Sequence, residues 1–380
     1  MERAKVYYKK KIMKAIISGG GTGGHIFPAL SIANALKAAD PKNEILFVGA
    51  EGKMEMEKVP AAGYKITGLP VAGLQRRVTL SNLALPFKVL KSLRMAKKII
   101  REFKPDVAVG VGGFASAPLL YAAQKLGIPT LIQEQNGFAG LTNKIVGKKA
   151  KKICVAYEGM EKFFPADRIV FTGNPIRGEM RPLTEEQRAE GLEMYGLDAG
   201  KRHIFIVGGS LGSGTLNESM KAWINAGCPG GENVEVIWQC GKYYKAGIDE
   251  FMAGAKPKCR IWYSDFIKRM DLAYAAADLV ISRAGASTVS ELCAVNKACI
   301  LVPSPNVAED HQTHNAMALV RKNAAVLIKD AEAVEKLLAT ATALVKDESK
   351  LAEMEKNIAV LARTDAAESI VKEIYNIIDK

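Results

Sequence analysis

A glycine-rich segment near the N-terminus constrains the fold more than any other stretch of the sequence. It reads SGGGTGGH over residues 18–25, follows the apolar run 15–17 and precedes a helix-like run over 27–37. Glycines between a strand and a helix remove side chains from the turn and let a ligand approach the backbone closely. The following helix presents N–H groups and the positive end of its dipole, so an anionic group is the expected ligand. A tight turn without a ligand is the competing interpretation.

A second glycine-rich segment weakens that competing interpretation. It reads GGSLGSG over residues 208–214, follows the strand-like run 203–207 and opens another helix. Ser210 adds a hydroxyl donor at this helix N-terminus, which suits a phosphate group. Two strand–glycine–helix units predict two similar domains, and Gly and Pro mark a join between them at 173–177.

The alternation of short apolar runs with helical runs predicts an α/β fold with two Rossmann-like, doubly wound domains that face each other. A chain of 380 residues exceeds one ordinary core. Continuous apolar segments at 45–48 and 106–111 are typical of buried parallel strands. Helices are expected near 24–38, 80–103 and 116–126. We assign an N-terminal domain to 1–175 with an extension at 1–12, a C-terminal domain to 176–363, and a last helix at 364–380 that packs back on the first domain.

Composition excludes several classes of protein. Hydrophobic residues make up 48% and charged residues 24% of the chain, as in globular proteins. No apolar run approaches the roughly 18 residues that span a bilayer, and no signal peptide is recognisable, so a cytoplasmic protein is expected. The six cysteines lack metal-ligand spacing and are expected to be buried free thiols. His311 and His314 have no third ligand at a suitable spacing, so we expect neither a metal nor a cofactor.

The net charge of +13 is concentrated in one segment. Nine Lys or Arg residues and a single acid, Glu102, lie between Leu74 and Lys104, interleaved with leucines and Phe87. Such a segment suits an anionic membrane surface. Nucleic acid is a weaker candidate, because only Phe87 and Phe103 are available to stack on bases. An amphipathic helix with a solvated basic face explains the pattern equally well.

Three further segments place polar or glycine residues where strands end. GVGGFASAP at 110–118 predicts a second backbone cradle, and QEQN at 133–136 requires polar partners from a ligand or from loop backbone. RAGASTVSE at 283–291 leads into a helix that carries Glu291. A carboxylate there can accept hydrogen bonds from both hydroxyls of a ribose, although it also complements the helix dipole.

Taken together, these motifs resemble the MurG family, the N-acetylglucosaminyltransferases that complete the lipid-linked disaccharide of peptidoglycan synthesis. The resemblance runs from about residue 14 to the C-terminus and rests on six segments: 19–25, 112–118, 134–136, 173–177, 208–210 and 286–291. It implies the glycosyltransferase B fold, in which the two domains face each other across a cleft that holds the active site. It also implies a role in cell wall synthesis, cell shape and cell division, and a peripheral position on the cytoplasmic face of the cell membrane.

The resemblance implies the reaction and its substrates. N-acetylglucosamine would move from UDP-N-acetylglucosamine to the 4-hydroxyl of undecaprenyl-diphospho-N-acetylmuramyl-pentapeptide, with inversion. Ser210 would contact the diphosphate, the Ile267 backbone the uracil, Glu291 the ribose and Gln312 the sugar. The full set of donor contacts implied is Thr22, Gly23, Gly24, Asn136, Arg177, Ser210, Ile267, Ala286, Ser287, Thr288, Val289, Ser290, Glu291 and Gln312.

The acceptor diphosphate would lie on Gly20, Gly21, Gly112 and Gly113, and its lipid tail explains the basic segment at 74–104 better than nucleic acid does. His25 is the preferred general base, because imidazole titrates near neutrality. Glu134 is the alternative base, and a phosphate-positioning or structural role for His25 remains open. N–H groups of the 208–214 segment can hold the leaving diphosphate, so no metal is obligatory. Ser213 and His311 depart from the usual family residues: Ser213 keeps a small residue in the turn, whereas His311 has a ring where the family often has an amide.

Three alternative functions account for only part of the sequence pattern. An NAD-dependent oxidoreductase with Glu51 as ribose ligand leaves the second glycine segment and Glu291 without a role. A UDP-N-acetylglucosamine epimerase of the same fold needs no lipid-facing surface, so the segment at 74–104 distinguishes it from the transferase. A non-catalytic basic binding protein does not explain two phosphate-type loops.

Overall fold

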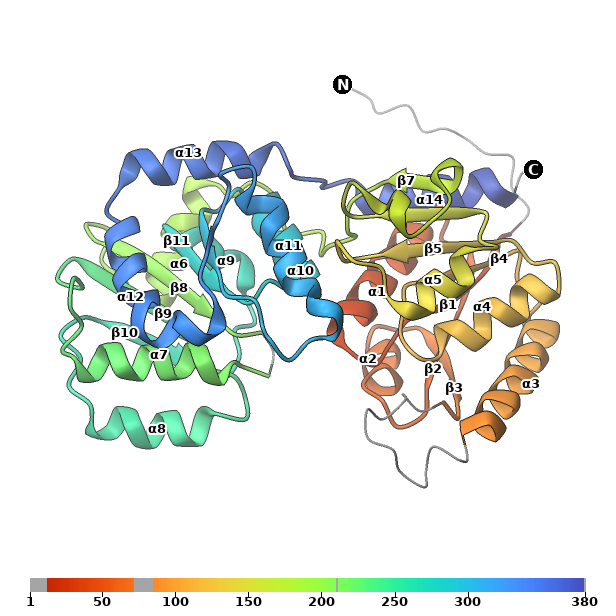
Figure 1. Cartoon of the computed structure of the whole chain (residues 1–380), viewed down its shortest axis with the longest axis horizontal. Coiled ribbons are helices and arrows are strands. Elements are labelled where there is room, and N and C mark those ends of the chain that lie inside the picture. The colour runs from red at the N-terminus through yellow and green to blue at the C-terminus, as the bar shows by residue number, and fades with distance from the viewer. Residues whose placement is uncertain (1–11, 72–84, 210, 379–380) are drawn as a thin grey trace. The chain divides into compact units, whose positions relative to one another are not determined.

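The computed structural model describes residues 12–71, 85–209 and 211–378, which form two compact units (Figure 1). Unit 1 contains the described residues of 1–135, 139–176 and 365–380, and unit 2 contains those of 136–138 and 177–364. Each unit is a parallel sheet covered by helices, which confirms the expected pair of α/β domains.

Unit 1 is built on a seven-stranded parallel sheet in the order β3-β2-β1-β4-β5-β6-β7. Because all the strands are parallel, the loops that follow them emerge at one edge of the sheet. The strands are β1 (Lys14–Ser18), β2 (Glu44–Ala50), β3 (Lys65–Leu69), β4 (Val107–Gly110), β5 (Thr130–Glu134), β6 (Lys152–Val155) and β7 (Ile169–Phe171). The strands expected at 45–48 and 106–111 are therefore confirmed within one or two residues.

Helices cover both faces of this sheet, so its strands are buried on both sides. Ile16 faces one core, with side chains of α3 and α4, whereas its neighbours Ala15 and Ile17 face another, with side chains of α1 and α14. The helices are α1 (Gly23–Ala39), α2 (Glu55–Ala61), α3 (Leu85–Phe103), α4 (Ser116–Lys125), α5 (Leu141–Gly147) and α14 (Ala366–Ile378). Residues 80–84 of the expected helix at 80–103 lie outside the described part of the chain.

The last helix, α14, completes the core of unit 1. It packs on α1, and Ile370 and Ile374 are both fully buried. The Asn43 amide also donates a hydrogen bond of 3.0 Å to the hydroxyl of Tyr375. Unit 1 therefore depends on residues that follow the main segment of unit 2 in the sequence.

Ile370→Ala is expected to lower the free energy of unfolding of unit 1 by about 2–5 kcal/mol. The Ile370 side chain is fully buried, so its truncation leaves a cavity in the core. The measurement is urea unfolding followed by circular dichroism. Glu368→Ala on the exposed face of the same helix is the control, with an expected change within about 0.5 kcal/mol. Equal unfolding midpoints for the two variants would contradict this packing.

Unit 2 repeats the architecture with a six-stranded parallel sheet in the order β10-β9-β8-β11-β12-β13. Its strands are β8 (Arg202–Val207), β9 (Val234–Gln239), β10 (Ile261–Ser264), β11 (Leu279–Ser282), β12 (Cys299–Leu301) and β13 (Val326–Leu327). Its helices are α6 (Glu185–Tyr195), α7 (Gly214–Asn225), α8 (Lys245–Gly254), α9 (Met270–Ala276), α10 (Ala286–Ala294), α11 (His311–Val320), α12 (Ala333–Leu344) and α13 (Glu348–Ala359).

All six cysteines are free thiols, five of them buried and Cys259 partly exposed. Burial raises the pKa of the Cys293 thiol to about 12, so it stays protonated at neutral pH. Among residues 12–71, 85–209 and 211–378, no helix combines the length and the apolar character that a membrane crossing requires.

Candidate active site

Two glycine loops pack against each other at the carboxyl edge of the unit 1 sheet. We call residues 19–24 loop A and residues 110–113 loop B. A Cβ atom on Gly113 would overlap the carbonyl oxygen of Gly20, and one on Gly19 would overlap the side chain of Val111. Gly112 and Gly113 also have φ values of +92° and +90°, which L side chains rarely adopt. Glycine is thus required by this contact, and the loops meet backbone to backbone.

His25 lies at the start of α1, directly after loop A. Its Nδ1 is 3.1 Å from the carbonyl oxygen of Gly20 and 3.4 Å from the hydroxyl of Thr22. A carbonyl oxygen only accepts, so Nδ1 carries the proton and the lone pair of the neutral ring is on Nε2. A Cβ atom on Gly112 would lie 2.9 Å from Nε2, so this nitrogen faces loop B.

Glu55, the first residue of α2, lies beneath loop A and was not singled out from the sequence. Its side chain is completely buried. One carboxylate oxygen accepts from the N–H of Ala50 at 3.0 Å, and the other accepts from the N–H of Gly21 at 2.9 Å. Gly21 therefore directs its N–H to a carboxylate of the protein in this conformation. In the sequence, an acidic residue in a first helical turn indicates only a favourable dipole interaction.

Glu134 ends β5 and is nearly fully buried. Its Oε2 accepts from the N–H of Gly140 at 3.1 Å and from the amide of Asn143 at 2.9 Å. These contacts connect the carboxylate to the loop that follows β5. They favour an anchoring role over the alternative role as general base.

The other polar residues of the segment 133–136 also find partners in the protein. The amide of Gln133 donates to Asn174 at 2.9 Å, and the amide of Gln135 donates to the carbonyl of Val111 at 2.9 Å. Asn174 in turn donates to the carbonyl of Gln135. Groups of the protein, and not a ligand, therefore accept these hydrogen bonds from the Gln133 and Gln135 amides. Asn136 belongs to unit 2, where it accepts from the amide of Asn315 at 3.2 Å.

In unit 2, Glu291 lies on α10 and is buried. The Arg177 guanidinium donates to its Oε1 at 3.0 and 3.2 Å, and the hydroxyl of Tyr274 donates to Oε2 at 3.3 Å. Burial raises the pKa of the Glu291 carboxyl above its ordinary value, although the charge of Arg177 opposes the shift. The ion pair with Arg177 and the contact with Tyr274 were not anticipated from the sequence.

The glycine segment 208–214, which we call loop C, joins β8 to α7. The hydroxyl of Ser213 caps α7 by accepting from the N–H of Leu216 at 3.4 Å, so the turn retains its form with serine at this position. Ser210, the residue we expect at the diphosphate, lies outside the described residues.

Gln239, at the end of β9, connects loop C to Ile267. Its buried amide donates to the carbonyl of Gly209 at 3.0 Å and accepts from the N–H of Ile267 at 2.8 Å. The N–H of Ile267 is therefore engaged within the protein, and its carbonyl is the group that suits the N3–H of a uracil. The sequence had no signal for Gln239, because a polar residue at a strand end is common.

Residues 286–290 form the first turns of α10. Gly285 precedes the helix and accepts from the N–H of Val289 at 2.9 Å, while the side chain of Val289 is buried. An α-helix leaves the N–H groups of its first turn without partners inside the helix, which suits an anion near Ser287 and Thr288. Gln312 on α11 accepts from the N–H of Ser304 at 2.8 Å, which leaves the NH₂ end of its side chain to donate to a ligand.

The described candidate residues thus fall into two sets, one in each unit. In unit 1, loops A and B bring together Gly20, Gly21, Thr22, Gly23, Gly24, His25, Gly112 and Gly113. Glu134 ends β5 of the same sheet and is bonded to the loop that follows it. Unit 2 carries Asn136, Arg177, Ile267, Ala286, Ser287, Thr288, Val289, Ser290, Glu291 and Gln312. Within residues 12–71, 85–209 and 211–378, no group of three or more His, Cys, Asp or Glu is arranged to hold a metal ion.

Comparison with known proteins identifies the family. Residues 15–155 match the glycosyltransferase family 28 N-terminal domain, and residues 203–370 match the C-terminal domain of the same family. A protein of Parabacteroides distasonis is 56% identical over 97% of this chain and 99% of its own length. Its name is UDP-N-acetylglucosamine--N-acetylmuramyl-(pentapeptide) pyrophosphoryl-undecaprenol N-acetylglucosamine transferase. The chain belongs to the MurG family. It is accordingly a glycosyltransferase.

Solved structures agree with this placement. The crystal structure of MurG from Acinetobacter baumannii superimposes with a TM-score of 0.74 at 29% identity, covering 96% of this chain and 99% of that one. A UDP-GlcNAc 2-epimerase from Neisseria meningitidis has a TM-score of 0.64 at 12% identity, with coverage of 96% and 100%. At this identity the epimerase shows a shared fold alone. The 56% identity to the Parabacteroides distasonis transferase, over 97% of this chain, favours a transferase over an epimerase.

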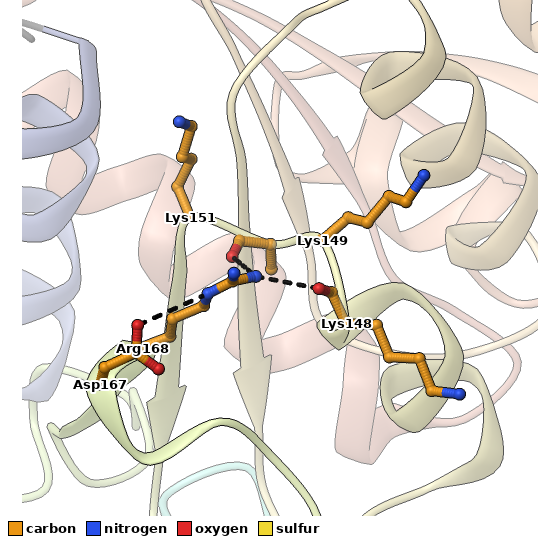
Figure 2. A pocket seen from close by; sticks show the side chains of 6 residues that line it. Lys148, Lys149, Lys151, Asp167 and Arg168 are labelled. Carbon is orange, nitrogen blue, oxygen red and sulfur yellow. Dashed lines mark hydrogen bonds and ion pairs between the residues drawn. The ribbon is translucent and has the colours of Figure 1, made fainter.

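A shallow basic pocket elsewhere on unit 1 does not belong to the site. It is lined by Lys148, Lys149, Ala150, Lys151, Asp167 and Arg168, whose lysine side chains extend away from one another (Figure 2). Arg168 is engaged with the backbone, donating to the carbonyls of Lys148 and Ala150 at 2.9 and 3.1 Å. The lysines precede β6, so they lie at the amino edge of the sheet, opposite loops A and B.

Proposed function

We propose that this protein transfers N-acetylglucosamine from UDP-N-acetylglucosamine to the 4-hydroxyl of undecaprenyl-diphospho-N-acetylmuramyl-pentapeptide, with inversion. The observation that carries the proposal is the 56% identity, over 97% of the chain, to a protein named for this transfer. The two groups of site residues support it, because each unit provides glycine loops and helix N-termini of the kind that bind diphosphates. Unit 2 supplies most of the proposed contacts to the sugar nucleotide, and unit 1 supplies the rest and binds the acceptor.

In the proposed reaction, Nε2 of His25 accepts the proton of the acceptor 4-hydroxyl as its oxygen attacks the anomeric carbon of the donor sugar. The bond from that carbon to the diphosphate oxygen breaks, and UDP leaves with the electron pair. The N–H groups of loop C and the N-terminus of α7 stabilise the charge that develops on the diphosphate. The protonated imidazole then releases its proton to solvent. Glu134 anchors its loop instead of acting as base, in keeping with its contacts to Gly140 and Asn143.

For the donor, Glu291 accepts hydrogen bonds from the ribose hydroxyls while Arg177 and Tyr274 hold its orientation. The Ile267 carbonyl accepts from the uracil, and Ser210, with the first turn of α10, contacts the diphosphate. Gln312 donates to the sugar. Thr22, Gly23, Gly24 and Asn136 complete the proposed donor contacts. For the acceptor, the proposed diphosphate site is the backbone around Gly20, Gly112 and Gly113; Gly21 lies in the same loop but keeps its N–H on Glu55.

We also place the protein on the cytoplasmic face of the membrane as a peripheral protein, with α3 as the contact and no role in nucleic-acid binding. Phe87, Val89 and Leu90 are 77%, 47% and 46% exposed, and exposed Lys88 and Lys91 lie among them. Since α3 leads into the amino end of β4, its first residues lie toward the carboxyl edge of the sheet. This is the edge that carries loops A and B, where a lipid-linked acceptor would be needed.

Replacing both Phe87 and Leu90 by serine is expected to weaken binding to vesicles of phosphatidylcholine and phosphatidylglycerol by at least about tenfold. Burying one such side chain contributes about 1.5–3 kcal/mol. Co-sedimentation measures the effect. Val360→Ser removes an apolar side chain that is 70% exposed in unit 2 and serves as the control. Equal partitioning of the two proteins would refute α3 as the membrane contact, and binding that persists without phosphatidylglycerol would refute a requirement for anionic lipid.

The function itself is tested by incubating the protein with labelled UDP-N-acetylglucosamine, a short-chain lipid-linked muramyl-pentapeptide and EDTA. Formation of the labelled disaccharide product establishes donor, acceptor and independence from divalent metal in one assay. Conversion of the donor to its 2-epimer, with no transfer, would establish the epimerase alternative instead.

A further inference from the structure

One peptide group in loop A lies between two ionisable side chains. The carbonyl of Gly20 and the N–H of Gly21 belong to the same peptide plane. The carbonyl accepts from Nδ1 of His25 at 3.1 Å, and the N–H donates to Oε2 of Glu55 at 2.9 Å. Glu55 and His25 are thus joined through a single amide, in the order carboxylate, amide, imidazole.

This arrangement has a direct electrostatic consequence. A carboxylate that accepts from an amide N–H polarises the amide and makes its carbonyl oxygen a stronger acceptor, because hydrogen bonds in a chain reinforce one another. The stronger acceptor favours the proton on Nδ1 and stabilises the imidazolium that forms when Nε2 is protonated. In serine proteases an aspartate performs this task by direct contact with the histidine.

The surroundings of the amide hold it in this orientation. A Cβ atom on Gly20 would overlap the carboxylate of Glu55, and one on Gly113 would overlap the Gly20 carbonyl oxygen. Glu55 is completely buried and its other oxygen is bonded to Ala50, so its carboxylate is fixed at both ends. A rotation of the amide would break the bonds to His25 and Glu55 together.

We propose that Glu55 is a positioning residue for His25, which it orients and polarises through the Gly20–Gly21 amide. The inference rests on the proposed function, in which His25 accepts the acceptor proton. Glu55 touches neither substrate: it keeps Nδ1 protonated, so that Nε2 is the nitrogen that accepts the proton of the 4-hydroxyl. The sugar–oxygen bond forms and the sugar–diphosphate bond breaks as described above.

Glu55→Gln tests this inference in steady-state transfer assays. Glutamine preserves the shape of the side chain but removes the charge, and its NH₂ group cannot accept from an N–H. We expect kcat to fall roughly 10- to 100-fold, as for other residues that orient a reacting side chain. We expect the KM for UDP-N-acetylglucosamine to stay within about twofold, because Glu55 is bonded to Gly21 and Ala50, neither of which is a proposed donor contact. Glu57→Gln is the control, since Glu57 is on the same helix with a side chain that is 79% exposed.

The tautomer of His25 provides a readout that a purely structural role would not change. The chain has only 4 histidines, so ¹⁵N-histidine labelling gives few signals. The two ring-nitrogen signals of His25 are identified by their loss in His25→Gln. At a pH where the ring is neutral, we expect wild-type protein to show a protonated Nδ1 and Glu55→Gln to show a mixture of tautomers. A protonated Nε2 in the wild-type protein overturns the inference even if the variant does not fold.

The outcomes separate this inference from the proposed function. Wild-type kcat in Glu55→Gln overturns the role of Glu55 and leaves the transfer reaction intact. A fall in kcat with an unchanged tautomer also overturns it, since Glu55 would then only support the loop. Absence of transfer by the wild-type protein, by contrast, counts against the proposed function itself.

Discussion

His25→Ala is expected to lower kcat by about 10²- to 10⁴-fold, the usual contribution of a positioned general base. The KM for UDP-N-acetylglucosamine is expected to stay within about twofold, because the imidazole acts in the transition state and not in holding the nucleotide. Steady-state kinetics with each substrate varied in turn measures both quantities.

Glu134→Gln is the comparison that decides between the two candidate bases. Its carboxylate is engaged with Gly140 and Asn143, so we expect a smaller loss of kcat, accompanied by a lower unfolding midpoint. A larger loss of kcat for Glu134→Gln than for His25→Ala would reverse the assignment. A large rise in donor KM at unchanged kcat for His25→Ala would instead assign His25 to phosphate positioning.

Glu291→Ala is expected to weaken the binding of UDP about 10- to 100-fold, with a matching rise in the donor KM. Hydrogen bonds to a charged group contribute about 1.5–3 kcal/mol, and the variant loses those to the ribose. It also leaves Arg177 without the carboxylate that lies 3.0 Å away. Isothermal titration calorimetry with UDP measures the affinity. Glu179→Ala is the control, because Glu179 is 3.9 Å from the same arginine and its side chain is 54% exposed. Equal losses for the two variants would show that Glu291 acts only through the charge of Arg177.

The binding of UDP should also depend on pH through this residue. Burial raises the pKa of Glu291, so its carboxylate is charged above that raised value and neutral below it. Ribose hydroxyls donate most strongly to the charged form. The affinity for UDP should therefore be complete well above the raised pKa and fall as the pH is lowered through it. Glu291→Gln should lack this decline, whereas an identical decline in the variant would assign it to another group.

Local patterns in the sequence predicted those parts of the molecule that depend on neighbouring residues. Glycines between an apolar run and a helical run identified loops A and C, and Glu291 followed from its position just inside a helix. The expected helix at 116–126 differs from α4 by one residue at its end. These features are encoded within about ten consecutive residues, so they are recognisable without the fold.

Residues that act across long separations could not be predicted in this way. Glu55 is 34 residues from Gly21, and Gln239 is 30 residues from Gly209. Each is an ordinary polar residue beside a strand or helix end, and only the packing of distant segments gives it a partner. The segment 133–136 shows the same limit. The sequence indicated that it needs polar partners, but it did not indicate that Asn174 is one of them.

The division of the chain between the two units determines the order in which they can be completed during synthesis. Residues 177–364 of unit 2 are continuous, whereas unit 1 requires α14 from the end of the chain. Until α14 is released from the ribosome, the apolar face of α1 that contains Ile32 and Leu36 lacks its cover. Unit 2 can thus complete its core first, while unit 1 must wait until α14, which follows unit 2 in the sequence, has been synthesised.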